Sequence, residues 1–169
     1  MVNWVIKTFK QEDADQIISY GMNSKLMELD AAYKDNRVCL ADQGNAYTLF
    51  VDKKPIVAGG IVVIWNGVAE GWVMASQNIY DIKFLAAKEI KKRTDILCKK
   101  NKIKRLQTSV KANFKTGVRF ANWLGLSSEG LMKRYGPDGS DYIRMAKIYW
   151  YGIYWKFSSS TNSKSNWRI

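Results

Sequence analysis

The sequence of 169 residues contains no histidine and only two cysteines. Without histidine it cannot form a Ser-His-Asp or Cys-His nucleophile, or a zinc site that includes histidine. The cysteines, Cys39 and Cys98, cannot build a four-cysteine metal site by themselves, so we predict no bound metal. We expect both thiols to be reduced and buried, which is the usual state of cysteine in a cytosolic chain.

Long apolar runs are also missing. The most apolar stretch, Ile61–Val73, is interrupted by Asn66, Gly67 and Glu70, and so falls short of the ~20 residues of a membrane-spanning helix. Residues 1–15 contain early acidic side chains and no apolar core, which argues against a secretory signal peptide. The sequence therefore predicts a protein that is made in the cytoplasm and does not bind membrane.

Apolar residues are plentiful in total, at 47%, and aromatic residues make up 13%, which is enough for the buried core of one domain. The formal net charge is +12. A basic balance of this size favours acidic partners such as nucleic acid, anionic phosphates or an acidic protein surface. Alternatively, the lysines only keep an aromatic-rich protein soluble.

Apolar spacing and turn residues predict an α/β (α+β) fold with a mixed, mostly antiparallel sheet flanked by helices. Asn66-Gly67 is a strong hairpin signal, Gly125 suits a helix end, and Gly59-Gly60 indicates a bend or bulge. The predicted strands are Val2–Phe9, Tyr47–Val51, Ile56–Trp65, Val68–Ala75, Lys104–Val110, Ser128–Tyr135 and Tyr142–Tyr149. The predicted helices are Gln11–Tyr20, Lys25–Tyr33, Asp81–Lys100 and Thr116–Leu124.

The segment Val110–Leu126, which reads VKANFKTGVRFANWLGL, resembles the strand-helix segment of the GNAT N-acetyltransferase fold. The turn Tyr135–Gly139 and the strand Tyr142–Met145 are similar to GNAT-like proteins of tailed phages, including an internal virion protein family of short-tailed phages. The resemblance covers residues 59–147 well, and the first third of the chain only by element order. It implies a GNAT-like, acyltransferase-like scaffold and a phage origin.

GNAT enzymes hold the pyrophosphate of coenzyme A in a glycine-rich loop before the long helix, and this is the acetyl-CoA site that the resemblance implies. The corresponding residues, Ala75–Asp81, contain no glycine, and Asp81 would repel an anion at the helix start. We therefore expect no bound cofactor. If acetyl-CoA does bind, the candidate contacts are Ser76, Gln77, Asn78 and Asn113.

The family's leaving thiolate is commonly protonated by a tyrosine on the short helix, and alignment on Leu124-Gly125 brings Ala121 to that position. Tyr135 and Tyr142 are the nearest phenols along the chain. Glu70, on a central strand, is the best-placed carboxylate for a general base, with Glu129 second. The alternative interpretation, which the sequence favours, is that Glu70 is an ordinary solvent-facing strand residue.

The densest basic run comprises Lys99, Lys100, Lys102, Lys104 and Arg105. It is interpreted either as a phosphate or nucleic-acid patch or as a solvated helix end that complements the helix dipole. No aromatic residues interleave this run along the chain, so sequence-specific reading of bases is not expected.

We predict a domain over residues 1–147, an aromatic arm or extra strand over 148–157 and a Ser-rich tail over 158–169. The arm either folds onto its own domain or anchors another subunit, since aromatic side chains dominate interface hot spots. Other phage structural proteins, or a second copy in a homo-oligomer, are the expected partners. The candidate anchor residues are Trp150, Tyr151, Tyr154, Trp155, Phe157 and Trp167.

The leading hypothesis from sequence is a virion-associated or assembly protein, a structural protein of the bacteriophage particle on a GNAT-like scaffold, without catalysis. The retained fold pattern, the missing glycine loop and the added aromatic arm motivate it. The alternative is an acetyl-CoA-dependent N-acetyltransferase with a divergent loop. A third hypothesis is a host-directed phage protein that binds nucleic acid through its basic helix. Fold alone does not decide among them.

Overall fold

The computed structural model describes residues 3–20 and 44–150 of the chain. Seven strands form one sheet: β1 Trp4–Thr8, β2 Ala46–Val51, β3 Lys54–Trp65, β4 Val68–Ala75, β5 Arg105–Lys111, β6 Ser127–Met132 and β7 Tyr142–Ile148. The helices are α1 Gln11–Ser19, the 3₁₀ helix η1 Gln77–Ile82, α5 Lys83–Lys100 and α6 Lys115–Trp123. None of the helices in this part of the chain is long and apolar enough to span a bilayer.

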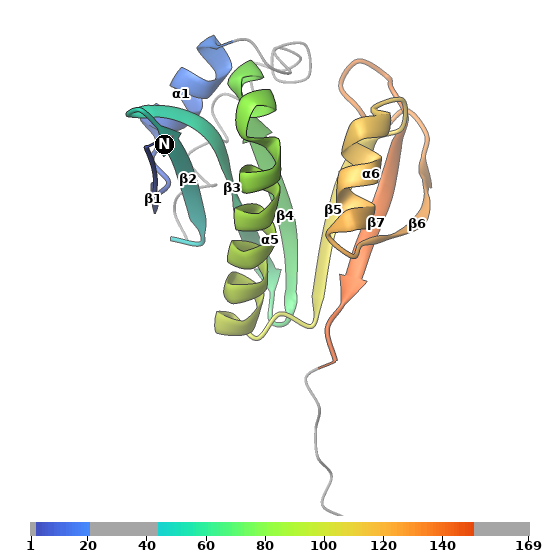
Figure 1. The fold of residues 1–169 in the computed structure, drawn as a ribbon. Helices are drawn as coiled ribbons and strands as arrows, with labels where there is room; N and C mark the ends of the chain where they lie inside the picture. Colours follow the sequence, from blue (N-terminus) through green and yellow to red (C-terminus); the bar gives the residue numbers. More distant parts are fainter. Residues whose placement is uncertain (1–2, 21–43, 151–169) are drawn as a thin grey trace, which may run out of the picture.

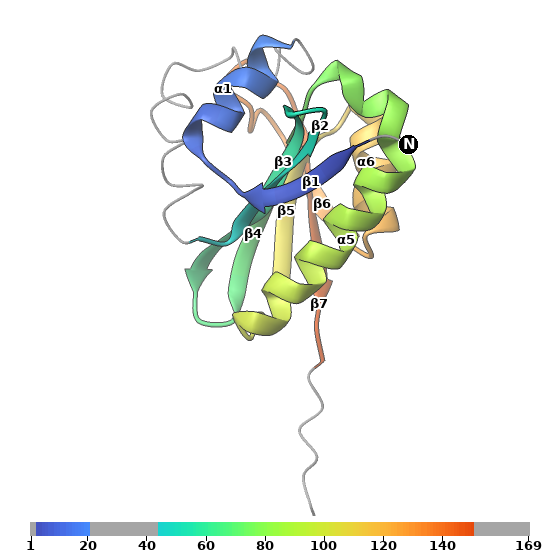
Figure 2. The ribbon, with the colours of Figure 1, turned by 60° about the vertical axis from the view of Figure 1, so that its left-hand side comes forward.

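The strands run in the order β1-β2-β3-β4-β5-β7-β6 across the sheet. All neighbouring pairs are antiparallel except β4 and β5, which are joined by the α5 crossover and run parallel. Helices α5 and α6 cover one face of the sheet, and α1 covers part of the other (Figures 1 and 2). The predicted mixed, mostly antiparallel sheet flanked by helices is therefore confirmed.

Successive side chains along each strand point to opposite faces of the sheet, and both faces carry apolar side chains. On the α1 face, Ala14 and Ile17 pack with Phe9 and Met74, and the Phe9 and Trp72 rings meet edge to face at 5.2 Å. The α5 face is larger, and two clusters fill it, the first around Leu49, Val57 and Ala86 and the second around Ile61, Leu97, Cys98, Ile103 and Leu106. Packing on each face fixes the strand register, because a slip of one residue would move every core side chain to the opposite face of the sheet.

Most predicted elements are present with shifted ends. Val68–Ala75 matches β4, whereas the helix predicted from Asp81 begins as η1 and becomes α-helical at Lys83. The bulge predicted at Gly59-Gly60 is wrong, since the register shifts lie at Leu49/Phe50 and Val63/Trp65. These glycines instead permit close approach of neighbouring backbone, because a Cβ at Gly60 would lie 2.3 Å from the Asn45 carbonyl oxygen. The predicted helix Lys25–Tyr33 and Cys39 lie outside the described residues.

Turn residues behave as their types predict. Gly67 in the β3–β4 turn has φ +83°, and Gly125 after α6 has φ +92°, both in the region that favours glycine.

Cys98 is a free thiol that is fully buried, as predicted, and burial raises the pKa of this thiol.

A polar cluster on α5 ties this helix to the end of β7. Asp95 accepts hydrogen bonds from Lys147 Nζ at 3.2 Å and from the Tyr149 hydroxyl at 3.1 Å, and it also pairs with Lys91. Burial alone would raise the pKa of Asp95, but the hydrogen bond and charge of Lys147, together with Lys91, hold it below its ordinary value. A depressed carboxyl pKa means that this cluster stabilises the fold above pH ~4 and loses its effect as the pH falls further.

We therefore expect Asp95→Asn to lower the free energy of unfolding at neutral pH by roughly 0.2–1 kcal/mol, the usual range for ion pairs near the surface. The difference from the unmodified chain should be smaller at pH 3 than at neutral pH, because stability from a lowered carboxyl pKa is lost as the pH falls below the ordinary Asp value of ~3.9. Urea unfolding at both pH values measures this. Asp52→Asn, in the exposed β2–β3 turn, is the control and should change neither value. An equal destabilisation at pH 3 would contradict the role of the charge.

Candidate functional site

The parallel strands β4 and β5 separate after three paired residues. The pairs are Val68–Arg105, Ala69–Leu106 and Glu70–Gln107, and beyond them the Thr108 hydroxyl donates to the Gly71 carbonyl oxygen at 2.9 Å. From there β4 stays paired with β3, and β5 stays paired with β7. We call this divergence the β4–β5 split. Figure 1 shows the two strands separating between α5 and α6.

In a continuous sheet the facing edges of two neighbouring strands satisfy each other's backbone groups. Within the described residues no strand pairing joins Trp72–Ala75 of β4 to Ser109–Lys111 of β5. The split therefore presents two strand edges in the middle of the sheet, where an extended ligand could find backbone hydrogen-bond partners.

The loop at the open end of the split leads from β4 into α5. Ser76 follows β4, and its backbone N–H donates to the Ile56 carbonyl oxygen at 2.8 Å. One buried side-chain donor here, Ser76 Oγ, lacks a hydrogen-bond partner within the described structure. Buried polar atoms are normally satisfied, so an unpaired donor at this place fits a site for a ligand with acceptor oxygens.

The N-terminus of α5 lies at the same end. Its N-cap residue, Ile82, has no side chain that can bond the first backbone N–H groups, and Lys83 occupies the first turn. An uncapped helix N-terminus attracts anions. Asp81, which is exposed and directly precedes this end, has the opposite effect.

A polar network lies beside the apex of the split, on the sheet face away from α5 and α6. Arg144 Nη1 on β7 donates to both carboxylate oxygens of Glu70, at 2.9 and 3.1 Å, and Gln107 Nε2 donates to Glu70 at 3.1 Å. Gln107 Oε1 in turn accepts a hydrogen bond from Arg105 Nε at 2.9 Å, and Arg105 pairs with both oxygens of Glu129 on β6. The network contains two carboxylates and two guanidinium groups on four strands, so its charges balance.

Glu70 is thus not the simple solvent-facing residue of the alternative interpretation. Its side chain is 31% exposed, and Arg144 and Gln107 hold it at the last paired position before the strands diverge. Glu129 is more exposed, at 38%, and lies three strands away from Glu70, on β6. The Arg105 hydrogen bond lowers the pKa of Glu129.

The short helix α6 offers no phenol to the split. Ala121 is 4% exposed and packs with Leu126 and Met145, and a methyl group cannot donate a proton. Tyr142 lies on the opposite face of β7 from Met145, the face that also carries Arg144, and its ring contacts Tyr135 at 5.4 Å. In the part of the chain that the structure describes, no hydrogen bond links either tyrosine to Glu70.

The other predicted site residues do not lie together in the structure. Gln77 and Asn78 are exposed on η1, and Asn113 is exposed in the turn before α6. Arg105 does not join the lysines of the basic run, because its guanidinium binds Glu129 and Gln107 on the other face. Trp150 is 90% exposed. The remaining anchor candidates, Tyr151, Tyr154, Trp155, Phe157 and Trp167, lie outside the described residues.

Sequence reasoning missed Arg144, Gln107 and Thr108 as site residues. Their signal was available only in part, because strand alternation would place Arg144 on one face of β7 without revealing what it faces. The partner of each depends on the strand order β4-β5-β7, which brings together residues 37 to 74 positions apart.

No protein-family model matches the sequence, and no curated protein matches it either. Solved structures do match. Ard1 from Thermoplasma volcanium superposes with a TM-score of 0.72 at 14% identity, over 86% of this chain and 97% of that protein. A GNAT-family acetyltransferase from Bacillus anthracis superposes at 0.65 and 15% identity, over 88% and 98% of the two chains. Ribosomal-protein-S5-alanine acetyltransferase from Vibrio fischeri superposes at 0.63 and 16% identity, over 88% and 96%.

These likenesses extend over nearly the full length of the other proteins, so the whole fold is shared and not one motif of it. The predicted GNAT-like fold is therefore confirmed. At 14–16% identity the comparison establishes the fold alone, and function has to be inferred from the chain's own residues.

Proposed function

We propose that the protein is an acetyl-CoA-dependent N-acetyltransferase that takes its acyl donor at the β4–β5 split. The observation that carries the proposal is the split itself, with Glu70 held at its apex. The likeness to solved acetyltransferases supports it, because this chain shares their fold over nearly their full length.

The donor end has residues that fit an anionic group. Coenzyme A, when bound, supplies the acyl group as an activated thioester. The unpaired hydroxyl of Ser76, the uncapped start of α5 and the ammonium of Lys83 would hold its phosphates. Two departures from the GNAT pattern weaken this end, namely the absence of glycine from Ala75–Asp81 and the charge of Asp81. We therefore expect donor binding to be weaker than a glycine-rich loop would give.

On the acceptor side, Glu70 is the group that can take a proton. An ammonium must lose a proton before its nitrogen can attack a thioester, and a carboxylate beside the attacking atom can accept it. Arg144 and Gln107 hold the Glu70 carboxylate on the sheet face away from α5 and α6 by bonding its oxygens. Their role is to position Glu70, since both donate hydrogen bonds to its carboxylate.

Charge variants at the start of α5 test donor binding in both directions. We expect Lys83→Gln to weaken acetyl-CoA binding and Asp81→Asn to strengthen it, each by roughly two- to fivefold, because a charge at a helix N-terminus contributes about 0.3–1 kcal/mol. Isothermal titration calorimetry at low salt measures both. Lys92→Gln, in the third turn of the same helix, removes the same charge as Lys83→Gln and should leave the affinity unchanged.

If the unmodified chain shows no saturable heat with acetyl-CoA, the proposal fails outright. If it binds but Lys83→Gln, Asp81→Asn and Lys92→Gln all behave alike, the donor phosphates do not lie at the α5 terminus.

A second candidate function is a non-catalytic role on the same scaffold, as a virion-associated protein that binds other phage structural proteins. The burial of Ala121 where the family has a tyrosine, and the glycine-free loop, favour it. It predicts no acetyl-CoA binding, together with presence of the protein in purified particles by mass spectrometry. Binding of acetyl-CoA together with absence from particles would exclude this second candidate.

A further inference from the structure

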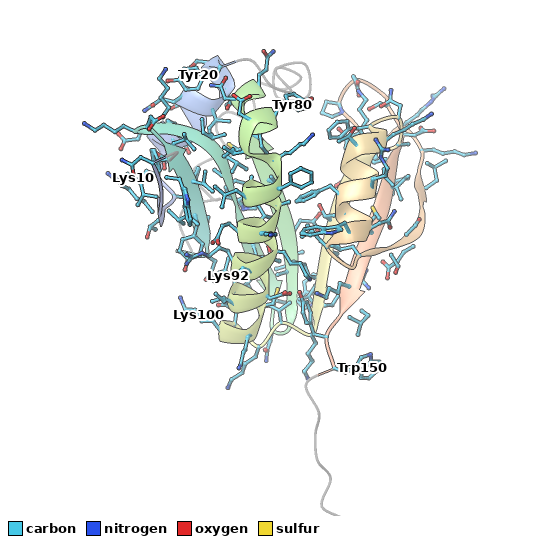
Figure 3. All side chains as sticks on the ribbon, viewed as in Figure 1. Lys10, Tyr20, Tyr80, Lys92, Lys100 and Trp150 are labelled. Carbon is cyan, nitrogen blue, oxygen red and sulfur yellow. The ribbon has the colours of Figure 1, made fainter. Side chains whose placement is uncertain are left out.

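Three chain segments meet at the end of the sheet opposite the β4–β5 split. The backbone N–H of Lys104 donates to the Gly67 carbonyl oxygen at 2.7 Å, and the N–H of Tyr149 donates to the Lys104 carbonyl oxygen at 2.8 Å. The β3–β4 turn, the α5–β5 connection and the end of β7 are thereby joined side by side. In Figure 3, Lys100 and Trp150 both lie at this lower end of the molecule.

Aromatic side chains flank this edge. Trp65, at the end of β3, is 65% exposed, and Trp150, just after β7, is 90% exposed. The pairing register sets Trp65, Val68, Arg105 and Ile148 in one row across β3, β4, β5 and β7. Ile148 in this row is also exposed, at 48%. Large aromatic rings that remain this open bury little surface within their own domain.

Positive charge gathers at the same edge without compensation. Lys99, Lys100, Lys102 and Lys104 are exposed, and none forms a salt bridge within residues 3–20 and 44–150. The nearest acids on α5 are already committed, Glu89 to Arg93, and Asp95 to Lys91 and Lys147. We call the set Trp65, Lys99, Lys100, Lys102, Lys104 and Trp150 the basic edge.

Lys102 holds a backbone conformation that favours glycine. Its φ is +53°, at the turn that ends α5, where the Ile103 N–H donates back to the Cys98 carbonyl oxygen at 2.8 Å. A glycine would fit this position without the steric cost that a side chain carries. A lysine there is consistent with a use for its charge at the surface.

We propose that the basic edge binds single-stranded nucleic acid, with the tryptophans stacking on bases and the lysines neutralising phosphates. Sites for single strands combine a positive surface that follows the backbone with aromatic rings on which bases stack. A duplex hides its base faces, so the exposed tryptophans favour a single strand over a double strand. The basic edge lies at the opposite end of β4 from the proposed donor site, so it is separate from that function.

The proposal is tested by fluorescence anisotropy of a labelled single-stranded oligonucleotide, titrated with the full chain at several salt concentrations. Trp150→Ala should lower affinity about tenfold, within the 1–3 kcal/mol that one stacked base contributes. The double variant Lys99→Gln, Lys102→Gly should reduce the slope of log affinity against log salt by about 1.4, since each neutralised phosphate contributes about 0.7 for single strands. The glycine substitution fits its position, so loss of folding does not explain a loss of binding.

The matched control is Lys54→Gln, Lys53→Gly at the other end of β3. It removes the same two charges, and Lys53 also has a positive φ, at +67°. The control for Trp150→Ala is Trp4→Ala. Trp4 is an exposed residue on the edge strand β1, and it pairs with Val51 at the end of β2 that leads to Lys53 and Lys54. If each control variant loses as much affinity as the variant it is matched to, the proposal is overturned. The same holds if a duplex binds as tightly as the single strand. An absence of binding by the unmodified chain would also overturn it.

Discussion

Replacing Glu70 with Gln is expected to lower the rate of acetyl transfer by about 10²–10⁴, the usual contribution of a positioned general base. Glutamine has the same shape and can still accept a hydrogen bond from Arg144, but it cannot take up a proton. Acetyl-CoA affinity should not change, because the donor phosphates are assigned to the other end of β4. Steady-state thiol release at saturating donor measures the rate, and calorimetry measures the affinity.

Glu129→Gln is the control for this substitution. Glu129 is also a carboxylate bonded through both oxygens to an arginine, Arg105, on the same face of the sheet. It lies on β6, away from the split, so its replacement should change the rate by less than about threefold, a difference well below a general-base effect. If the two variants lose equal activity, the network acts only as a structural unit and Glu70 is not the base.

Gly60→Val is expected to be the most destabilising substitution at any glycine of the sheet, by about 3 kcal/mol or more. A Cβ at Gly60 would lie 2.3 Å from the Asn45 carbonyl oxygen and 2.6 Å from Ala46 Cβ. Both belong to backbone or to the first atom of a side chain, so rotation of a side chain cannot relieve the clash. The Asn45 carbonyl oxygen also accepts the Ile61 N–H at 3.0 Å, and that bond would be disturbed.

Urea unfolding followed by circular dichroism measures the effect. Gly71→Ala is the control, since its Cβ would lie 3.3 Å from Leu106 Cδ1, a terminal methyl that can move aside. We expect it to cost less than about 1 kcal/mol. Equal unfolding midpoints for Gly60→Val and the unmodified chain would contradict the close approach of β2 and β3 at this point.

Local chemistry was enough to predict most of the fold. Asn66-Gly67 between two β-branched runs specifies a tight hairpin, and the apolar spacing within residues 81–100 specifies a helix. Each signal is local, because the residues that carry it are close together along the chain. The error at Gly59-Gly60 arose because glycine in a strand indicates either a bulge or a close backbone contact. The sequence does not distinguish the two, since the contacting residues, Asn45 and Ala46, are distant along the chain.

The candidate site was harder to predict. Glu70 was identified from its strand position, but the arginine that orients it comes from β7, 74 residues later, through a strand order that periodicity does not encode. The surroundings of the basic run, residues 99–105, were also not predictable from neighbouring sequence. No aromatic residue interrupts residues 99–105 in sequence, yet folding brings Trp65 and Trp150 to the edge that these lysines occupy. Both juxtapositions are products of long-range pairing.

Acetyl transfer by the purified chain tests the proposed function most directly. The protein is incubated with acetyl-CoA and a panel of primary amines, including peptide N-termini, and both free thiol and acetylated amine are measured over time. The proposal predicts thiol release that requires the amine, matches acetylated product one for one, and is lost with Glu70→Gln but kept with Glu129→Gln. Saturable acetyl-CoA binding without any amine-dependent release, or no binding at all, would contradict it.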